Sequence, residues 1–483
     1  MWILTARQAA ISAVTFGGVF GLARMLEPEA FAIFGYATTA FIVAAAIGDL
    51  GAGAAIIQGR DDDPLVERAF ARQLLFWLPI LLGAGGAAIA LGLYDMSAPT
   101  VALLCAGFLL LALQALPTAL LERRLAFVAV ARAEVLQRCV FVGAALVLAA
   151  LHPSAWTIAA ALLAAGVAGY ALVLHAARWR WRPRLHRAAA ADAFASEWWQ
   201  GRLASQANYA AYSLLGGLLF DAETVGVFVF ALALTQVPAL LAPLGARALF
   251  PSLAQGGSRD DVQVLARMLQ VLLLVSLPLV AILASLAEPL TVHFFGEKWI
   301  DAVPIIRLEC ATTALGLILT PLVPVLYLAL EARSVKRVLV GWAIGIWVLT
   351  PLAALVLGRY APSTVQIVLA AAVLAVFARM ARDIRLLPSL RAHALALAVS
   401  ITTGAVLAHW ADDALRTAAL GVLVAALQVA ATFAFSGRAG ARALLGDALG
   451  GARRDAALAA RDGEQPVAEQ AGEAPLEPPV ERM

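Results

Sequence analysis

Residues 156–175 read WTIAAALLAAGVAGYALVLH, a continuous apolar run that contains no Asp, Glu, Lys or Arg. A hydrocarbon core of about 30 Å is crossed by roughly 20 apolar residues in helical form. Because lipid offers no partner to unpaired backbone groups, and because the run does not alternate as barrel strands do, a helix is the required form. The stretch therefore predicts one transmembrane helix.

Similar runs lie on both sides of this stretch, and the same criterion predicts about fourteen spans in all. The chain is 62% hydrophobic and 14% charged over 483 residues, whereas soluble domains carry about 25% charged residues. This composition excludes a soluble protein and predicts an all-α, polytopic membrane protein. The spans are approximately 2–22, 31–57, 74–94, 101–121, 128–151, 156–175, 203–220, 225–244, 268–286, 305–330, 338–357, 362–377, 392–408 and 418–435.

Basic residues fall in the loops that follow the even-numbered spans, for example Arg123 and Arg124 after the fourth. Short loops rich in Lys and Arg stay in the cytoplasm. The alternation predicts that both termini are cytoplasmic. The basic loop 178–187 includes Trp179 and Trp181, and it is predicted to be an interfacial linker that contacts membrane lipids.

The start of the chain matches its middle at an offset of roughly 194 positions, where 29–36 lies over 223–230. The matched spans are six apart, so the copies have the same orientation. The repeat predicts two six-helix lobes related by a pseudo-two-fold axis along the membrane normal, plus two extra helices. The predicted parts are 1–187 (first lobe), 188–391 (second lobe), 392–436 (the appended helix pair) and 437–483 (a disordered cytoplasmic tail).

Four further stretches resemble one known family. They are LARMLEPEAF at 22–31, DLGAGAAIIQ at 49–58, LFPSLA at 249–254 and FGEKW at 295–299. Together they are similar to the Wzx-type polysaccharide flippases. The resemblance implies two six-helix lobes around a central cavity. It also implies transport of an undecaprenyl-diphosphate-linked oligosaccharide from the cytoplasmic to the periplasmic leaflet of the bacterial inner membrane. Polysaccharide polymerase and export machinery are candidate partners.

Arginine is the side chain best suited to bind a diphosphate that crosses hydrocarbon, because its planar guanidinium group forms bidentate, charge-assisted hydrogen bonds. Arg7 in the first span and Arg202 at the start of the seventh occupy nearly equivalent places in the repeat. We predict that they bind the diphosphate, with Gln8, Gln206 and Asn208 as neighbouring hydrogen-bonding groups. The alternative is that both arginines extend to lipid headgroups.

Other charged residues also lie within predicted spans, where a charge costs at least about 2.5–3.5 kcal/mol at the bilayer centre. Glu134 and Arg138 are four residues apart and share a helix face, so they form either a structural ion pair or part of the site. Arg307 and Glu309 are two apart and point in different directions. Asp49, isolated in the second span, either caps a helix break or binds a coupling ion, and Glu134 and Glu309 are further candidates for ion coupling.

Outside the spans, Arg24 is predicted to form a local ion pair with Glu27 or Glu29. Cys105, Cys139 and Cys310 all lie in apolar runs, and the six histidines are scattered, so no disulfide, metal site or cofactor is predicted. No nucleic-acid partner is predicted either.

Two other functions stay open beside the flippase. A cation-coupled multidrug exporter of the same superfamily predicts a pocket dominated by buried acids. A membrane glycosyltransferase or ligase predicts a large external loop with catalytic carboxylates or histidines. The longest external connection, around 288–301, is too short for such a domain, and the chain has no phosphate loop or nucleophile elbow. The sequence therefore predicts a transporter and not an enzyme.

Overall fold

A computed structural model describes residues 2–48, 50, 52–53, 56, 63–90, 97–184, 214–239, 259–329, 332–380 and 387–436 of the chain. Every regular element in these ranges is a helix. Nine of the described helical stretches are long and apolar enough to cross a membrane, or ten if a bent pair counts as one span. The protein is therefore all-α and polytopic, as predicted.

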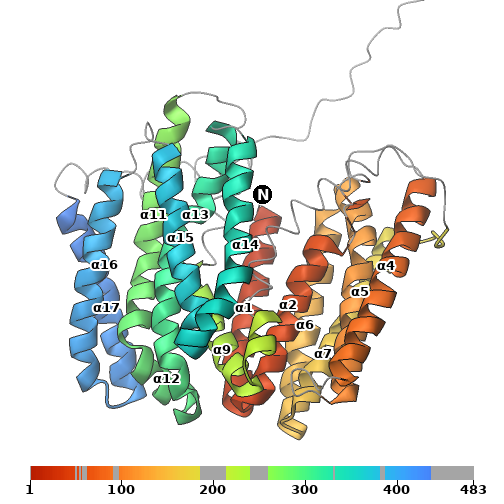
Figure 1. Cartoon of the computed structure of the whole chain (residues 1–483), viewed down its shortest axis with the longest axis horizontal. Helices are drawn as coiled ribbons and strands as arrows, with labels where there is room; N and C mark the ends of the chain where they lie inside the picture. The colour runs from red at the N-terminus through yellow and green to blue at the C-terminus, as the bar shows by residue number, and fades with distance from the viewer. Residues whose placement is uncertain are drawn as a thin grey trace, which may run out of the picture.

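The first bundle contains the helices shown from red to yellow in Figure 1. They are α1 (Trp2–Met25), α2 (Pro28–Ile47), α4 (Asp63–Ala90), α5 (Ala98–Arg123), α6 (Phe127–Leu151) and α7 (Ala155–Ala177). Small residues bring α5 and α7 close together, because a Cβ atom added at Gly107 would lie 3.2 Å from the Leu163 nitrogen. The hydrophobic effect does not drive helices together in lipid, so helix association in a membrane depends on van der Waals packing, which close backbone contact strengthens.

The second bundle and a C-terminal pair of helices follow along the chain. The bundle consists of α9 (Ala222–Ala239), α11 (Arg259–Ser285), α12 (Ala287–Phe295), the 3₁₀ helix η2 (Glu297–Ala302), α13 (Val303–Ala329), α14 (Ala332–Leu357) and α15 (Ala361–Met380). The pair is α16 (Leu387–Leu407) and α17 (Ala414–Phe435), which pack on each other and on α11.

Thirteen of the fourteen predicted spans coincide with a described helix, while the seventh, 203–220, lies mostly outside the described residues. Two predicted stretches differ in detail from the described helices. Helix α2 ends at Ile47, and Leu50 has a left-handed conformation with φ of 53°, so the predicted span 31–57 is interrupted there. Residues 52, 53 and 56 are helical again, and the rest of 49–57 apart from Leu50 lies outside the described residues. The external connection after the ninth span is helical, since α12 follows α11 at a bend of 79° and η2 comes next.

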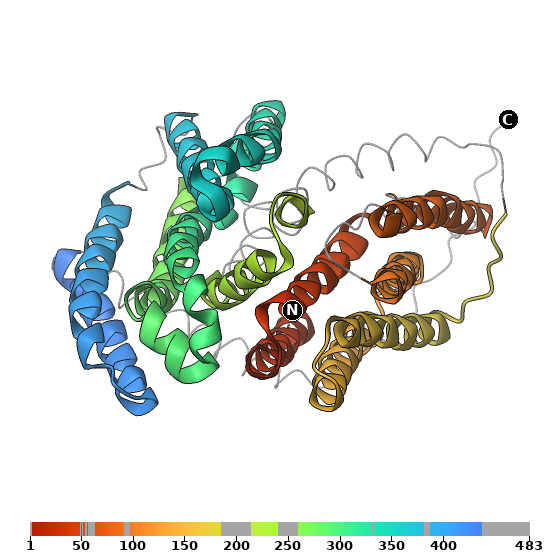
Figure 2. The same cartoon turned by 60° about the horizontal axis from the view of Figure 1, so that its bottom comes forward.

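The two bundles meet where α2 crosses α9, near the end of the molecule that comes forward in Figure 2. A Cβ atom at Gly226 would lie 1.7 Å from the Pro28 carbonyl oxygen, and one at Gly35 would lie 2.2 Å from Val229. Gly35 and Val229 are 194 positions apart (229 − 35), which is the offset of the repeat. In two copies related by a two-fold axis, residues close to the axis meet their own equivalents.

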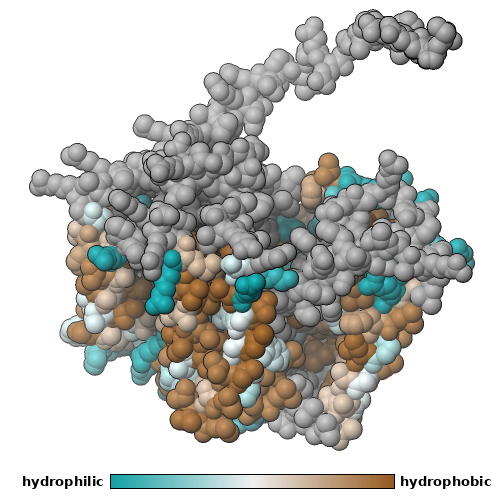
Figure 3. Space-filling view, turned by 45° about the horizontal axis from the view of Figure 1, so that its top comes forward, coloured by the Kyte–Doolittle hydropathy of each residue, from teal (hydrophilic) through white to brown (hydrophobic). Residues whose placement is uncertain are grey.

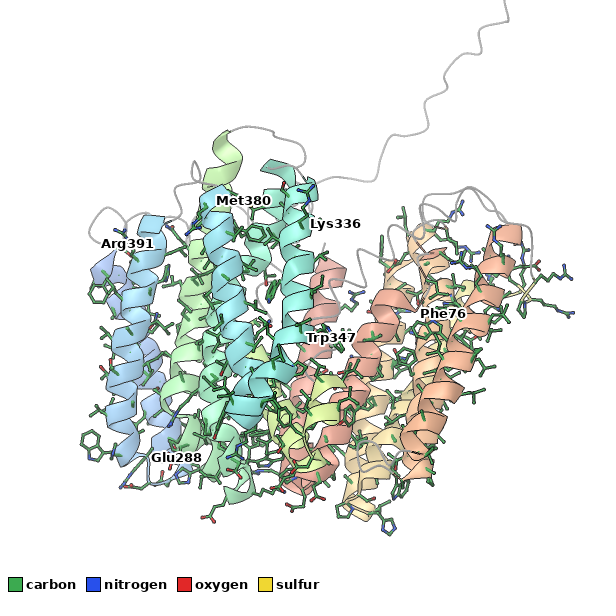
Figure 4. The ribbon with its side chains drawn as sticks, in the orientation of Figure 1. Phe76, Glu288, Lys336, Trp347, Met380 and Arg391 are labelled. Atoms are coloured by element: carbon green, nitrogen blue, oxygen red, sulfur yellow. The ribbon has the colours of Figure 1, made fainter. Side chains whose placement is uncertain are left out.

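Charged residues are concentrated toward the two ends of the helices, and apolar side chains cover their flanks. Figure 3 shows hydrophobic residues over much of the sides, and Leu355 and Val356 are more than four-fifths exposed. Lys336 and Arg391 lie toward the end that carries the N-terminus, whereas Glu288 lies at the opposite end (Figure 4). We call these the N-terminal end and the distal end of the molecule.

The tryptophans at the start of the basic linker pack against the first bundle. Trp181 is buried in a cluster with Ile56 and Leu116, and the Trp179 ring packs edge-on against Phe70 at 5.3 Å. The two tryptophans therefore attach the linker to the first bundle, while Arg178, Arg180 and Arg182 are exposed, and their contact with lipid headgroups stays a prediction.

Candidate functional site

Two arginines and one glutamate from α1 and α6 meet inside the first bundle. The Arg7 Nη1 atom lies 2.9 Å from the Glu134 Oε2 atom, and the two side chains are 14% and 31% exposed. The Nε atom of Arg7 is buried and has no hydrogen-bond partner among the residues that the structure describes. Arg7 therefore retains a donor after its ion pair with Glu134 has formed.

Arg138 follows Glu134 by one helical turn and extends toward α2. Its guanidinium carbon lies 4.1 Å from the centroid of the Phe41 ring. Arg138 is eleven residues from the start of α6, about 16 Å along the helix axis, which is near the middle of a bilayer core. We call Arg7, Glu134 and Arg138 the arginine cluster, and its formal charge is +1 (two arginines minus one glutamate).

A buried glutamine pair sets the rotation of α6 that directs these side chains. The Gln137 Nε2 atom donates to the Gln114 Oε1 atom at 2.8 Å and to the Ala165 carbonyl oxygen at 3.2 Å. Gly169 makes room for the pair, because a Cβ atom there would lie 2.2 Å from the Gln137 Nε2 atom. With Gln137 held against α5 and α7, the adjacent face of α6 directs Glu134 toward α1 and Arg138 toward α2.

The predicted pairing of Glu134 with its own helix neighbour is only part of the arrangement. The two residues do share a face of α6, but the structure shows Glu134 paired with Arg7 of another helix and Arg138 placed over an aromatic ring. Sequence spacing finds partners within one helix, whereas these partners come from α1 and α2. Phe41 was not predicted as part of the site, because an aromatic residue in an apolar run carries no distinguishing signal.

Several predicted site residues lie outside the described part of the structure. These are Arg202, Gln206, Asn208, Asp49 and the side chain of Gln8. The pairing of Arg7 with Arg202 across the two lobes therefore stays a prediction.

Arg307 and Glu309 are both on α13, far from the arginine cluster. Arg307 is half exposed near the distal end, where its Nη2 atom lies 4.0 Å from the Glu288 Oε2 atom. Glu309 is 2% exposed and lies among the buried residues of the second bundle. The structure thus places Arg307 and Arg7 toward opposite ends of the molecule.

Arg24 does not form the predicted local ion pair. Its Nε atom donates to the Phe294 carbonyl oxygen at 2.7 Å, and its guanidinium lies over the Phe20 ring. Glu27 instead lies 3.6 Å from the Nζ atom of Lys298. Both contacts join residues more than 250 positions apart, which local spacing does not detect.

No group of three or more His, Cys, Asp or Glu side chains that could hold a metal ion occurs in the part of the chain that the structure describes. The polar groups that converge inside the first bundle are guanidinium, carboxylate and amide groups. Such a set suits the binding of an anion by charge-assisted hydrogen bonds.

Comparison with known proteins gives a family and a fold. A family model described as polysaccharide biosynthesis protein matches residues 21–304. The teichuronic acid biosynthesis protein TuaB of Bacillus subtilis (strain 168) is 31% identical over 111 residues, which are 22% of this chain and 23% of that protein. The aligned part is therefore under a quarter of the length of that relative.

Two solved structures share the fold at low sequence identity. The lipid II flippase MurJ in an inward closed conformation has a TM-score of 0.68 at 12% identity and covers 89% of this chain and 98% of its own. An inward-facing multidrug resistance transporter of the MATE family in the MOP superfamily has a TM-score of 0.55 at 13% identity, with 76% and 94% covered. Both structures have the helical arrangement seen here.

Proposed function

The chain belongs to the polysaccharide biosynthesis protein family, and from this premise we propose that it is a flippase for lipid-linked oligosaccharides. The proposed substrate is an undecaprenyl-diphosphate-linked oligosaccharide, which moves from the cytoplasmic to the periplasmic leaflet by alternating access. The observation that carries the proposal is the arginine cluster, which has a net positive charge inside a membrane bundle.

The polar headgroup is the part of the substrate that is difficult to transport. The lipid tail stays in the bilayer throughout, but the diphosphate and the sugars must cross hydrocarbon. Arginine stays protonated even where solvation is poor, and its fork matches phosphate oxygens. Arg7 retains a buried donor, and a cation–π contact of Arg138 with Phe41 consumes none of the donors of that guanidinium. We propose that these two side chains bind the diphosphate, together with Arg202, Gln8, Gln206, Asn208 and Arg307 at other stages.

The cation-coupled multidrug exporter is the second candidate, because a MATE transporter shares the fold. A cationic substrate requires acids in excess at the site. The arginine cluster has the opposite balance, with two arginines to one glutamate. This charge balance favours the flippase. Asp49, Glu134 and Glu309 remain our proposed residues for ion coupling in either case.

We propose the bacterial inner membrane as the location, with both termini in the cytoplasm. Lys336 and Arg391 lie toward the N-terminal end, whereas Glu288 in the first turn of α12 lies at the opposite end, where Asp412 and Asp413 join α16 to α17. This distribution supports the orientation under the positive-inside rule. We also propose 1–187 and 188–391 as the two lobes, 392–436 as the appended pair and 437–483 as a cytoplasmic tail.

The proposal is tested with purified protein in liposomes that contain a fluorescent undecaprenyl-diphosphate oligosaccharide. The fraction of lipid in each leaflet is measured with a membrane-impermeant quencher. We expect the protein to equilibrate the two leaflets, and we expect the Arg7→Ala, Arg202→Ala double variant to lose this activity while its insertion and yield stay near those of the parent. An unchanged leaflet distribution together with transport of small organic cations would replace the flippase by the exporter.

A further inference from the structure

The C-terminus of α1 is capped by side chains from the other bundle. The last carbonyl groups of a helix have no donor within it and need partners from elsewhere. The Trp299 Nε1 atom donates to the Ala23 carbonyl oxygen at 2.9 Å, and the Lys298 Nζ atom donates to that of Leu26 at 2.8 Å and that of Arg24 at 3.3 Å. Both donors come from η2 of the second bundle. A cation at a helix C-terminus also interacts favourably with the helix dipole.

The reverse contact is made at the same place. Arg24, in the last turn of α1, donates from its Nε atom to the carbonyl oxygen of Phe294 at the end of α12. Each bundle therefore supplies a cation to the C-terminus of a helix in the other bundle. Since α1 begins at the N-terminal end of the molecule and finishes at the distal end, all of these hydrogen bonds lie at the distal end (Figure 1).

Aromatic rings bury one of these hydrogen bonds, the one from Trp299 to the Ala23 carbonyl oxygen, while those of Arg24 and Lys298 lie nearer the surface. Trp299 is fully buried, stacked on Phe230 of α9 with ring centroids 4.2 Å apart. Its ring also meets Phe31 of α2 edge-on at 5.2 Å. Trp299 thus touches both bundles where α2 crosses α9. The hydrogen bond of Trp299 with Ala23 is shielded from water in this way, which makes it stronger than an exposed one.

Resting on the proposed flippase function, we propose that Arg24, Lys298 and Trp299 form a latch that holds the distal gate closed. In alternating access the substrate leaves through an end that must open. Opening at the distal end separates η2 from α1, so every one of these hydrogen bonds breaks. Water then satisfies the exposed carbonyl groups, which keeps the change reversible. The latch therefore sets the ratio of closed to open molecules at this end.

The latch is tested by distance measurement between spin labels in nanodiscs, without substrate. Labels are attached at His152→Cys in the first bundle and His409→Cys beside α16, in a chain whose three native cysteines are replaced by alanine. The test variant is Lys298→Met with Trp299→Phe, which removes the donors but keeps side-chain length and one aromatic ring. We expect the open-to-closed ratio to rise about tenfold, from the loss of two to three hydrogen bonds.

A matched control carries Lys336→Met with Trp410→Phe, which changes an exposed lysine and an exposed tryptophan outside the latch. The control is expected to keep the distance distribution of the parent. If the test variant fails to fold, Arg24→Met tests the reverse contact and is expected to shift the ratio in the same direction. A parental distribution in every folded latch variant would overturn the proposal.

The outcome also separates the latch from the proposed function, because no transport is measured. A shifted distribution in a protein that does not move lipid-linked oligosaccharide would retain the latch and reject the flippase. If the protein transports the lipid but the latch variants leave the distance distribution unchanged, the flippase is retained and the latch is rejected.

Discussion

Arg138 carries its charge near the middle of α6, where a cation is expensive unless a partner compensates it. The Phe41 ring supplies a cation–π contact worth roughly 0.5–2 kcal/mol, depending on how well water is excluded. Glu134 lies one turn away and is itself paired with Arg7. The compensation is therefore shared among three helices, and a phosphate group that entered would find two guanidinium groups already in place.

We expect Arg138→Met to reduce the rate of lipid transport about 10- to 100-fold, because the substrate loses one or two charge-assisted hydrogen bonds. Arg138→Lys should fall between this variant and the parent, because lysine keeps the charge but lacks the planar fork. Initial transport rates in liposomes, with membrane yield as the check on folding, measure the effect.

Arg416→Met is the matched control, because Arg416 is 60% exposed at the start of α17 in the C-terminal helix pair. It is expected to transport at close to the parental rate. Equal rates for Arg138→Met and the parent would remove Arg138 from the proposed site.

Among the elements, the crossing of α2 and α9 joins the two bundles, and glycine makes the close approach possible. A side chain at Gly226 would overlap the Pro28 carbonyl group, which is backbone and has no room to rotate away. At Gly35 the facing group is the Val229 side chain, which also sits against the helix with restricted χ1 freedom. The register of this crossing is therefore set by two small residues on opposite helices.

We expect Gly226→Ala to destabilise the protein by about 3 kcal/mol or more, because the overlap forces the helices apart. Thermal unfolding in detergent, followed by tryptophan fluorescence, measures the change. The control is Gly143→Ala in α6, where a Cβ atom meets nothing within 4 Å. Alanine there should be neutral or stabilising by up to about 1 kcal/mol, from its higher helix propensity. Similar shifts in the two variants would contradict a packing role for Gly226.

For the whole molecule, the two ends differ in charge and in contact. The N-terminal end carries the basic side chains of Lys336 and Arg391, and the distal end carries Glu288 and the contacts between η2 and α1 (Figure 4). The positive-inside rule favours our proposed orientation, with the basic end in the cytoplasm. In that orientation the contacts between η2 and α1 would lie on the periplasmic side.

This orientation predicts the labelling of single cysteines in a chain without native cysteines. Trp410→Cys at the distal end should react with a membrane-impermeant maleimide in intact cells whose outer membrane is permeabilised. Lys336→Cys should react only after the inner membrane is disrupted. Gel-shift quantification of the labelled fraction measures both. Labelling of Lys336→Cys from outside, with protection of Trp410→Cys, would reverse the proposed orientation.

Hydropathy and loop charge were enough to predict an all-helical membrane protein, most of its spans and an orientation, since these depend on local composition and on the thickness of a bilayer. The arginines at 7 and 138 were also predicted, because a charge in an apolar run is conspicuous. Their partners were not. Phe41 beside Arg138, the ion pair of Arg7 with Glu134 and the contact of Trp299 with Ala23 join residues far apart in sequence. Only helix packing decides such contacts, because each depends on the rotation and depth of two helices at once.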